Sequence, residues 1–459
     1  MMMKKIVILL VLVLSISDLK AQFHSINYDF GANAQVLQTN PGTAYEYQSY
    51  FGIPLLSNTQ FFAGNSGFAL LDLFGTQHGF EQNVFTTLDQ ISNTDNLLVN
   101  YRQDLFGMGF STENGTLHHF GLYWELDHIT YFPADMIRLG FEGNASHLND
   151  VYEAKYLATQ TNLIQTLYYG MDKKVNSRLN LGFRVKLYSG LANVQSVYNK
   201  GKFYTTEGTH NYYAHHLEDI DIEGQTSGFN EDAEGINYYT NKLFYSGNYG
   251  PGLDLGLSYQ SNDNLRFSFS LLDLGFIYYS KDVHNYKIEG DYTYEGANVQ
   301  FPENNFIDYW ENVKEEFKDK IERSENTSGY ISYRPATLYA SMRYGLGNLR
   351  QQDCANLLNP KTEFTDFFGL IGYAQYHPLN IHWGASLYYE KRWSKYFATR
   401  LNYTADNYSY TSIGVGLVLN MGRFQLYTTV DNLIGLSNLA KSQKQSISFG
   451  LNIVKFNSR

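Results

Sequence analysis

Apolar and polar residues alternate with a period of two in long segments that recur to the end of this chain. In residues 179–187 the odd positions are Leu179, Leu181, Phe183, Val185 and Leu187, and the even positions between them are Asn180, Gly182, Arg184 and Lys186. The pattern returns in residues 253–259, 265–271 and 413–419. A closed transmembrane barrel explains both faces, because its outside meets lipid, its inside meets water and every backbone group is paired between strands. The alternation therefore predicts an all-β protein, a closed antiparallel transmembrane β-barrel.

The first 21 residues have the form of a secretory signal peptide. Lys4 and Lys5 precede an apolar run from Ile6 to Leu14, and the segment ends at Ala21. The run is too short for a spanning helix, which makes a retained membrane anchor the weaker alternative. We expect a mature chain that starts at Gln22. That residue is not a cysteine, so lipidation at the new N-terminus is excluded.

Charge and cysteine content exclude several classes of protein. The formal net charge is −11, and it becomes −13 when a segment with three lysines and one aspartate is removed. An acidic export product without a basic stripe is a poor nucleic-acid binder. Cys354 is the only cysteine, so an internal disulfide and a CxxC site are both excluded. With 8 prolines and no linker-like stretch, residues 22–459 are predicted to form a single barrel domain.

Segment length and aromatic content separate an outer-membrane barrel from a soluble β-protein. Many alternating segments run about 9–13 residues, whereas a tilted membrane strand needs about 9–11 and a soluble strand usually has about 5–6. The chain has 40 Tyr and 31 Phe, with tyrosine pairs such as Tyr168 and Tyr169 near strand ends, where aromatic girdles lie. A secreted soluble β-sandwich is the alternative, because sandwich strands also alternate.

The lengths of the connections predict how the barrel is oriented. Residues 260–265 and 420–424 are short polar turns, whereas 201–248 and 282–328 are long. Barrels of this class place short turns in the periplasm and long loops outside. Counting strands forward from residue 265 brings the C-terminus into the periplasm. Residues 345–366 then form a long periplasmic connection, which departs from the rule.

Two segments read as helices. Phe306, Trp310, Val313, Phe317 and Ile321 follow one another at steps of four, three, four and four, and charged residues fill the positions between them. This spacing predicts an amphipathic loop helix over 305–323. Its apolar stripe either covers the barrel rim, which we favour, or faces a partner protein. A second, shorter helix is predicted over 133–143, where a proline suits the first turn.

Three runs carry a family resemblance: residues 39–74, 252–280 and 427–436. Together they resemble a family of Bacteroidota outer-membrane barrels of unknown function, which is similar to the FadL-, PorV- and PorP-like barrels. The resemblance covers about Asn27 to Val454 and implies a barrel of about 14 strands, within 14–16, in the outer membrane. It implies no activity and transfers no catalytic residue.

Asn40 and Pro41 lie where such families carry an Asn-Pro pair near the mature N-terminus. In FadL-like barrels the resemblance implies an N-terminal segment that enters the lumen as a plug. Asn-Pro-Gly is also ordinary turn chemistry, and a turn before the first strand is the favoured alternative. Glycines on the polar face, such as Gly414 and Gly416, indicate either close packing or strand bends.

No enzyme chemistry stands out. A mixed cluster of His210, His215, His216, Glu218, Asp219, Asp221 and Glu223 matches no defined metal spacing, and its alternation with isoleucines favours a half-buried strand. A second group, His118, His119, Glu125, Asp127 and His128, has no nucleophile placed beside it by any motif and is interpreted as a luminal polar row. The sequence thus predicts a non-enzyme with no catalytic residues, no cofactor and no metal site.

Two functions from different classes remain. The first is a FadL-like channel or transporter for small solutes, hydrophobic ones included, which rests on the resemblance alone. The second is an outer-membrane scaffold that docks a secreted or periplasmic protein, as PorV- and PorP-like proteins do in type IX secretion and gliding. Besides outer-membrane lipid, such proteins are the predicted partners, and nucleic acid is not. An apolar lumen with a lateral opening favours transport, and a lumen packed with its own side chains favours a scaffold.

Overall fold

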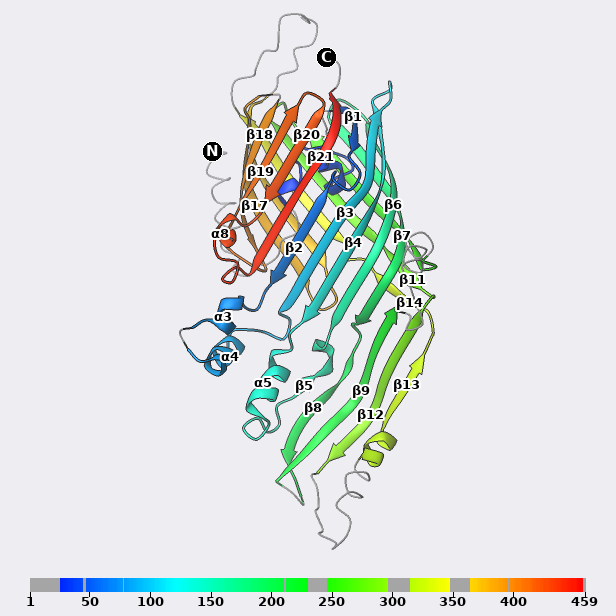
Figure 1. The fold of residues 1–459 in the computed structure, drawn as a ribbon, viewed down its shortest axis with the longest axis vertical. Helices are drawn as coiled ribbons and strands as arrows, with labels where there is room; N and C mark the ends of the chain where they lie inside the picture. Colours follow the sequence, from blue (N-terminus) through cyan, green and yellow to red (C-terminus); the bar gives the residue numbers. More distant parts are fainter. Residues whose placement is uncertain are drawn as a thin grey trace, which may run out of the picture.

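The computed structural model describes residues 25–43, 47–76, 78–209, 212–229, 246–295, 314–346, 364–394 and 396–456. Its strands form one antiparallel sheet that closes on itself (Figure 1). Wall strands that are consecutive around the barrel pair edge to edge, and the last strand, β21, pairs with β1 and β2. This closure satisfies the backbone groups at both edges, as a membrane-spanning sheet requires.

The barrel wall has 14 strands. One wall position is shared by β1 and β2, which both pair with β21 and β3, and another is shared by β14 and β15, which both pair with β11. In chain order the wall consists of β1 (Tyr47–Gly52) with β2 (Thr59–Asn65), β3 (Asn96–Ser111), β4 (Thr116–Tyr131), β6 (Thr159–Lys174), β7 (Leu179–Ser196), β10 (Tyr249–Gln260), β11 (Leu265–Tyr279), β14 (Tyr330–Tyr333) with β15 (Thr337–Leu346), β16 (Asp366–Tyr376), β17 (Ile381–Arg392), β18 (Phe397–Asp406), β19 (Ser412–Met421), β20 (Phe424–Val430) and β21 (Lys444–Phe456). The predicted fold class and strand number are confirmed.

Apolar side chains face outward and polar side chains face the lumen. On β7 the side chains of Leu181, Val185 and Leu187 are 43%, 46% and 49% exposed, whereas Arg184 and Lys186 between them are only 1% and 5% exposed. The arrangement inverts that of a water-soluble protein, whose charged residues almost never lie fully buried unless paired. It suits a wall with lipid outside and a polar interior. The predicted facing of residues 179–187 is confirmed.

The two ends of the barrel differ. At one end, called the turn end, the strands are joined by tight turns such as 260–265 and 421–424, and β21 also ends there (Figure 1). At the opposite end, called the loop end, lie α3 (Leu70–Phe74), α4 (Phe80–Leu88), α5 (Ala134–Glu142) and α8 (Leu433–Leu436). None of the helices in the described ranges is long and apolar enough to cross a membrane. Most of the predicted long connection 345–366 lies outside the described residues.

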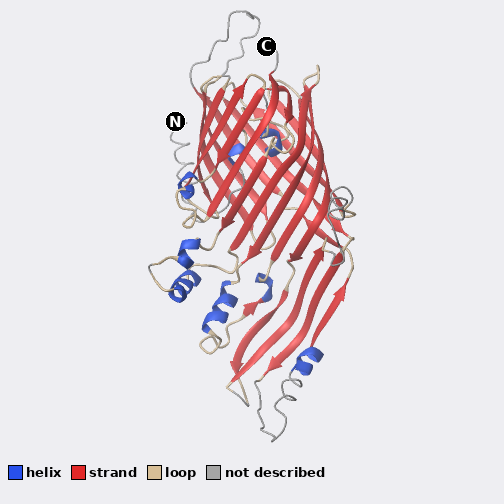
Figure 2. Cartoon of the chain, in the orientation of Figure 1, coloured by secondary structure: helices blue, strands red, loops and turns tan. Residues whose placement is uncertain are grey.

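A sheet projects beyond the wall at the loop end (Figure 2). Its strands are β5 (Tyr152–Glu153), β8 (Lys200–Glu207), β9 (Tyr213–Ser227), β12 (Val283–Tyr294) and β13 (Ile321–Asn326), paired in the order β5, β8, β9, β12 and β13. We call it the projecting sheet. The expectation that 201–248 and 282–328 are long loops was therefore wrong over much of their length. These strands continue the wall into water, where alternation is not enforced by lipid on one side.

The amphipathic helix ends earlier than predicted. Residues 314–320 are helical, but Ile321 begins β13 and is only 3% exposed. From there the chain pairs antiparallel with β12, with Ile321 opposite Gly290 and Asn326 opposite Asn285. Cross-strand pairing has overridden the helical periodicity. The ring of Phe317 packs edge-on against Tyr292 with a centroid distance of 5.3 Å, whereas Phe306, Trp310 and Val313 lie outside the described residues. The short helix predicted over 133–143 is present as α5, with its proline at the N-cap instead of the first turn.

Candidate functional site

The N-terminal residues 25–43 lie inside the barrel (Figures 1 and 2). They contain a 3₁₀ turn, η1 (Ser25–Asn27), and one helical turn, α2 (Val36–Thr39). From residue 26 to residue 43 every side chain is buried except that of Gln38, which is half-buried. We call residues 25–43 the plug segment, because it occupies the lumen of its own barrel.

The plug segment is hydrogen-bonded to strands all around the lumen. The amide of Gln35 donates to Asn452 at 3.0 Å, and Ser270 donates to the carbonyl of Thr39 at 2.7 Å. Eight wall strands, β3, β7, β10, β11, β15, β18, β20 and β21, each contribute at least one partner, and these include Asp104, Arg184, Ser258, Ser270, Arg343, Arg400, Gln425 and Asn452. The backbone of the plug segment is buried and cannot form hydrogen bonds to water. Hydrogen bonds to the wall take their place.

A cluster of buried charges fixes the first turn of the plug segment. The carboxylate of Asp29 accepts from Arg266 at 2.5 Å, and its carbonyl accepts from Arg343 at 2.6 Å. Arg400 donates to the carbonyls of Ile26 at 3.1 Å and Tyr28 at 2.6 Å. We call Asp29, Arg266, Arg343, Glu390 and Arg400 the plug clasp.

Glu390 joins two of the three arginines of the plug clasp. Its oxygens lie 2.7 Å from Arg343 and 2.8 Å from Arg400, and its side chain is fully buried. The two guanidinium groups compensate the buried negative charge of Glu390. A single buried charge without such partners would be strongly destabilising. Two guanidinium groups on β15 and β18 are thereby held in place to bind plug carbonyls.

The structure places Asn40 and Pro41 within the plug segment, against β7 and β10. Asn40 is fully buried, donates to the carbonyl of Leu257 at 3.2 Å and accepts from the amide of Gly42 at 2.9 Å. The second bond is the turn that Asn-Pro-Gly chemistry predicts. A Cβ atom added at Gly182 on β7 would lie 2.0 Å from the carbonyl oxygen of Pro41, so only glycine fits there. The turn thus sits inside the lumen.

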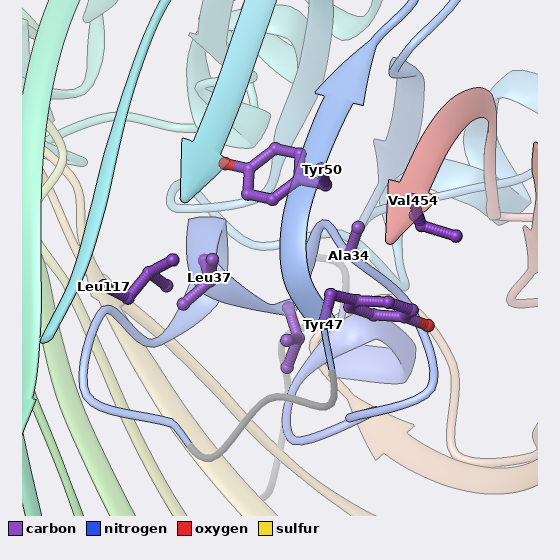
Figure 3. Packing of buried hydrophobic residues seen from close by; sticks show 7 residues of the cluster. Ala34, Leu37, Tyr47, Tyr50, Leu117 and Val454 are labelled. Atoms are coloured by element: carbon purple, nitrogen blue, oxygen red, sulfur yellow. The ribbon is translucent and has the colours of Figure 1, made fainter. Parts of the chain in front are cut away.

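Apolar contacts also hold the plug segment against the wall. Ala34, Val36 and Leu37 pack with side chains of β1, β4 and β21 in one buried cluster, whose members are Ala34, Val36, Leu37, Tyr47, Tyr50, Leu117 and Val454 (Figure 3). Tyr28 stacks on Tyr339 of β15 at a centroid distance of 4.8 Å. A Cβ atom at Gly416 would lie 3.0 Å from the Phe30 ring, which favours close packing at that glycine.

The rest of the lumen is also charged. On β7 and β10, Asp254 forms ion pairs with Arg184 and, at 2.9 Å, with Lys186. Arg334 pairs with Glu125 at 3.0 Å and with Asp127 at 2.5 Å. Ion pairs therefore line the lumen near these residues. A path for apolar solutes would need an apolar surface instead.

The predicted luminal row on β4 is only partly luminal. His119, Glu125 and Asp127 face inward and are buried or half-buried. His118 and His128 lie on the outward face, where they bond to Tyr169 at 2.7 Å and to Thr161 at 2.8 Å. The correction follows from strand parity, because neighbouring residues of one strand cannot share a face.

The wall is interrupted beside the plug segment. Residues 53–58 leave the sheet between β1 and β2, and Leu55, with a positive φ of 62°, and Leu56 are 55% and 50% exposed on the outside. A narrow crevice between Ser57, Gln35 and Tyr168 adjoins this interruption and is too small to hold a water molecule. The interruption was not predicted from the sequence, although Pro54 signals it, since proline is unsuited to a paired central strand.

The histidine and acid cluster of 210–223 lies on the projecting sheet. His215 bonds to Asn144 at 2.9 Å and to Thr205 at 3.1 Å, and the ring of His216 stacks on Tyr204. Burial, together with the neighbouring His216, lowers the pKa of His215. His210 lies outside the described residues, and within them no three His, Cys, Asp or Glu side chains gather as metal ligands.

A closed fourteen-stranded barrel filled by its own N-terminal segment defines the class as a plugged transmembrane β-barrel. The chain belongs to the DUF5723 family, described as a family of unknown function, whose model matches residues 41–431. A search of curated proteins finds no match.

Solved structures with some likeness include barrels with different roles. The Ralstonia pickettii toluene transporter TbuX is 10% identical, with 92% of this chain and 93% of that chain covered and a TM-score of 0.39. A Pseudomonas aeruginosa FadL homologue is 9% identical, with 90% and 91% covered and a TM-score of 0.41. The translocator domain of the autotransporter NalP from Neisseria meningitidis is 8% identical, with 92% of each chain covered and a TM-score of 0.32. These values assign no function to the chain.

Proposed function

We propose that this protein is an outer-membrane scaffold whose plugged barrel anchors a protein-docking platform at the cell surface. The observation that carries the proposal is the charged lumen, in which wall side chains pair with one another, as Arg184 does with Asp254 and Arg334 with Glu125. The plug segment is bonded to wall strands on all sides, and the plug clasp holds it through buried charges. A barrel closed in this way supplies anchorage and rigidity, neither of which depends on an open path.

The apolar outer face supports the placement in a membrane. Its side chains, including Leu181, Val185 and Leu187, are exposed to the surroundings in a continuous alternating pattern. Exposed apolar surface of this extent needs lipid around it. The closed, backbone-satisfied barrel is the form in which strands cross a bilayer.

The loop end supplies a surface for a partner protein. Large apolar side chains of α3, α4 and α5 stand exposed there: Leu70 at 58%, Phe74 at 66%, Phe80 at 55% and Phe141 at 51%. The rings of Phe74 and Phe80 stack with a centroid distance of 5.8 Å. Aromatic groups that remain exposed next to one another are typical of protein interfaces. We call these four residues the apolar loop-end patch.

Two measurements test the scaffold. In planar bilayers the native protein is expected to show no unitary conductance, and deletion of residues 25–43 is expected to create it. In cells, a photoreactive phenylalanine analogue at Phe80 is expected to give one discrete protein adduct, whereas the same analogue at Glu113, in an exposed turn at the turn end, gives none. Steady conductance by the native protein together with equal labelling from both positions would overturn the proposal.

A gated channel for small solutes, hydrophobic ones included, is the second candidate. It is favoured by the wall interruption at 53–58, which lies next to the plug segment and could open sideways when that segment moves. The side chains of Gln35 and Asn452 are hydrogen-bonded through their ends, so cysteines at these positions, joined by a short bifunctional methanethiosulfonate cross-linker, would tether the plug segment to β21 in a chain with Cys354 replaced by Ser. A transporter predicts that cross-linking of this pair blocks solute uptake and that reduction of the cross-link restores it, with Gln35→Cys alone as control. Uptake that is absent in every state excludes the channel.

A further inference from the structure

A cavity of about 660 Å³ lies in the projecting sheet, away from the lumen and the plug segment. It spans β8, β9 and β12 and is closed at one edge by the segment that carries Glu153 and Lys155. Its volume falls within the about 300–1,000 Å³ typical of small-molecule sites. Asn199 lines it, is 4% exposed, and is fixed by hydrogen bonds to Leu157 and Ser196.

Irregular backbone on three neighbouring strands creates the cavity. Gly201 on β8, Asp219 on β9 and Gly290 on β12 have positive φ values of 113°, 53° and 133°. The register of β9 shifts at this level against both β8 and β12. Bulges on adjacent strands bend the sheet. Glycine is needed at both positions because a Cβ atom would lie 2.7 Å from the Ile220 side chain at Gly201 and 2.2 Å from the Lys320 carbonyl oxygen at Gly290.

The lining groups are charged but largely neutralise one another. Lys155 pairs with Glu153, and Lys200 lies 3.7 Å from Asp221. Lys287, just outside the cavity, pairs with both Asp221 and Glu289. The cavity therefore presents many donors and acceptors without a strong net charge, and the carboxylates oppose a phosphate or another anion.

We propose that this cavity binds a short, uncharged oligosaccharide. The hydroxyl groups of a sugar both donate and accept hydrogen bonds, and they match the paired ammonium and carboxylate groups that line the cavity. No comparable match exists for a metal ion, because the carboxylates within the described residues do not converge as ligands. The site goes beyond the docking role and does not depend on it, since the apolar loop-end patch lies on other elements.

The test uses the full-length protein in an amine-oxide detergent, which carries no sugar headgroup. Neutral tri- and tetrasaccharides of glucose, galactose, mannose and N-acetylglucosamine are titrated by calorimetry. At least one is expected to bind with a Kd below about 1 mM. Asp219→Asn, which keeps a residue that tolerates positive φ, and Lys202→Gln are each expected to weaken binding about tenfold.

The control is Glu207→Gln, an exposed acid at the far end of β8 that does not line the cavity. It is expected to bind the same sugar unchanged, and the barrel of each variant is checked by its heat-modifiable migration. Absence of binding by every sugar at about 10 mM overturns the proposal. Equal loss in the control, or tighter binding of inorganic phosphate or Ca²⁺ than of any sugar, overturns it as well.

Discussion

Arg400 lies where the plug segment meets the barrel wall. Its guanidinium donates to the carbonyls of Ile26, Tyr28 and Asp29 and to Glu390, and the side chain is fully buried. Hydrogen bonds from a charged donor are stronger than those between neutral groups. Three of the hydrogen bonds of Arg400 are accepted by backbone carbonyls that are buried away from water. At the scale of single residues, the closed state of the barrel therefore depends on a few buried cations.

Arg400→Met is predicted to destabilise the protein by about 3–5 kcal/mol, because it leaves Glu390 with less compensation and the plug carbonyls without a donor. The free energy of unfolding in lipid vesicles measures this. Arg423→Met, an exposed change in the turn after β19, serves as the matched control. The double change Arg400→Met with Glu390→Gln should recover part of the loss. An unaltered free energy in the single variant would disprove the role of the plug clasp.

His147 gives the loop end a dependence on pH. Its two ring nitrogens lie 2.7 Å from Glu142 at the end of α5 and 3.1 Å from Asp150, and these hydrogen bonds raise the pKa of His147. The stabilisation is complete below the unfolded pKa of about 6.5 and is lost as pH rises through the higher folded value.

Amide hydrogen exchange of α5, corrected for intrinsic rates, is therefore predicted to be slower at about pH 6 than at about pH 8. His147→Gln should remove the difference, and His78→Gln, a change of an exposed histidine before α4, should keep it. The same pH difference in His147→Gln would contradict the assignment.

At the scale of elements, the wall strands were predictable because lipid imposes a strict period of two. The alternating segments 253–259, 265–271 and 413–419 lie within β10, β11 and β19. The strands β8 and β12 were taken for loops, since they project beyond the wall and bear polar residues on both faces. The alternation of Asp219, Asp221 and Glu223 with isoleucines did indicate a strand, and it lies in β9. The plug clasp was beyond sequence analysis for a different reason. Alternation shows that Arg343 and Arg400 face inward, but pairing with Asp29 depends on residues more than 300 positions apart.

The facing of β7 leads to a prediction at this scale. Val185→Arg places a charge on the outward face between Phe183 and Leu187, and it should cost about 2–4 kcal/mol near the bilayer midplane. Val175→Arg, the same exchange in the exposed turn before β7, should cost about 0–1 kcal/mol. Unfolding in lipid vesicles compares the two. Equal costs would show that Val185 does not meet lipid.

At the scale of the whole molecule, the two ends of the barrel must face different compartments. The tight turns and the end of β21 share the turn end, whereas the helices and the projecting sheet share the loop end (Figure 1). Since barrels of this class keep short turns in the periplasm, the loop end is expected outside the cell. Both the apolar loop-end patch and the cavity of the projecting sheet would then be open to extracellular molecules.

Two cysteine variants, made after Cys354→Ser, test this orientation. Lys318→Cys lies in the exposed helical turn 314–320 beside the projecting sheet, and Asp263→Cys lies in the exposed turn between β10 and β11. A membrane-impermeant thiol reagent is predicted to label position 318 on intact cells and position 263 only after the outer membrane is broken. The two positions control for each other, because both are exposed and lie at opposite ends. The reverse pattern would show that the loop end faces the periplasm and that any docked partner binds there.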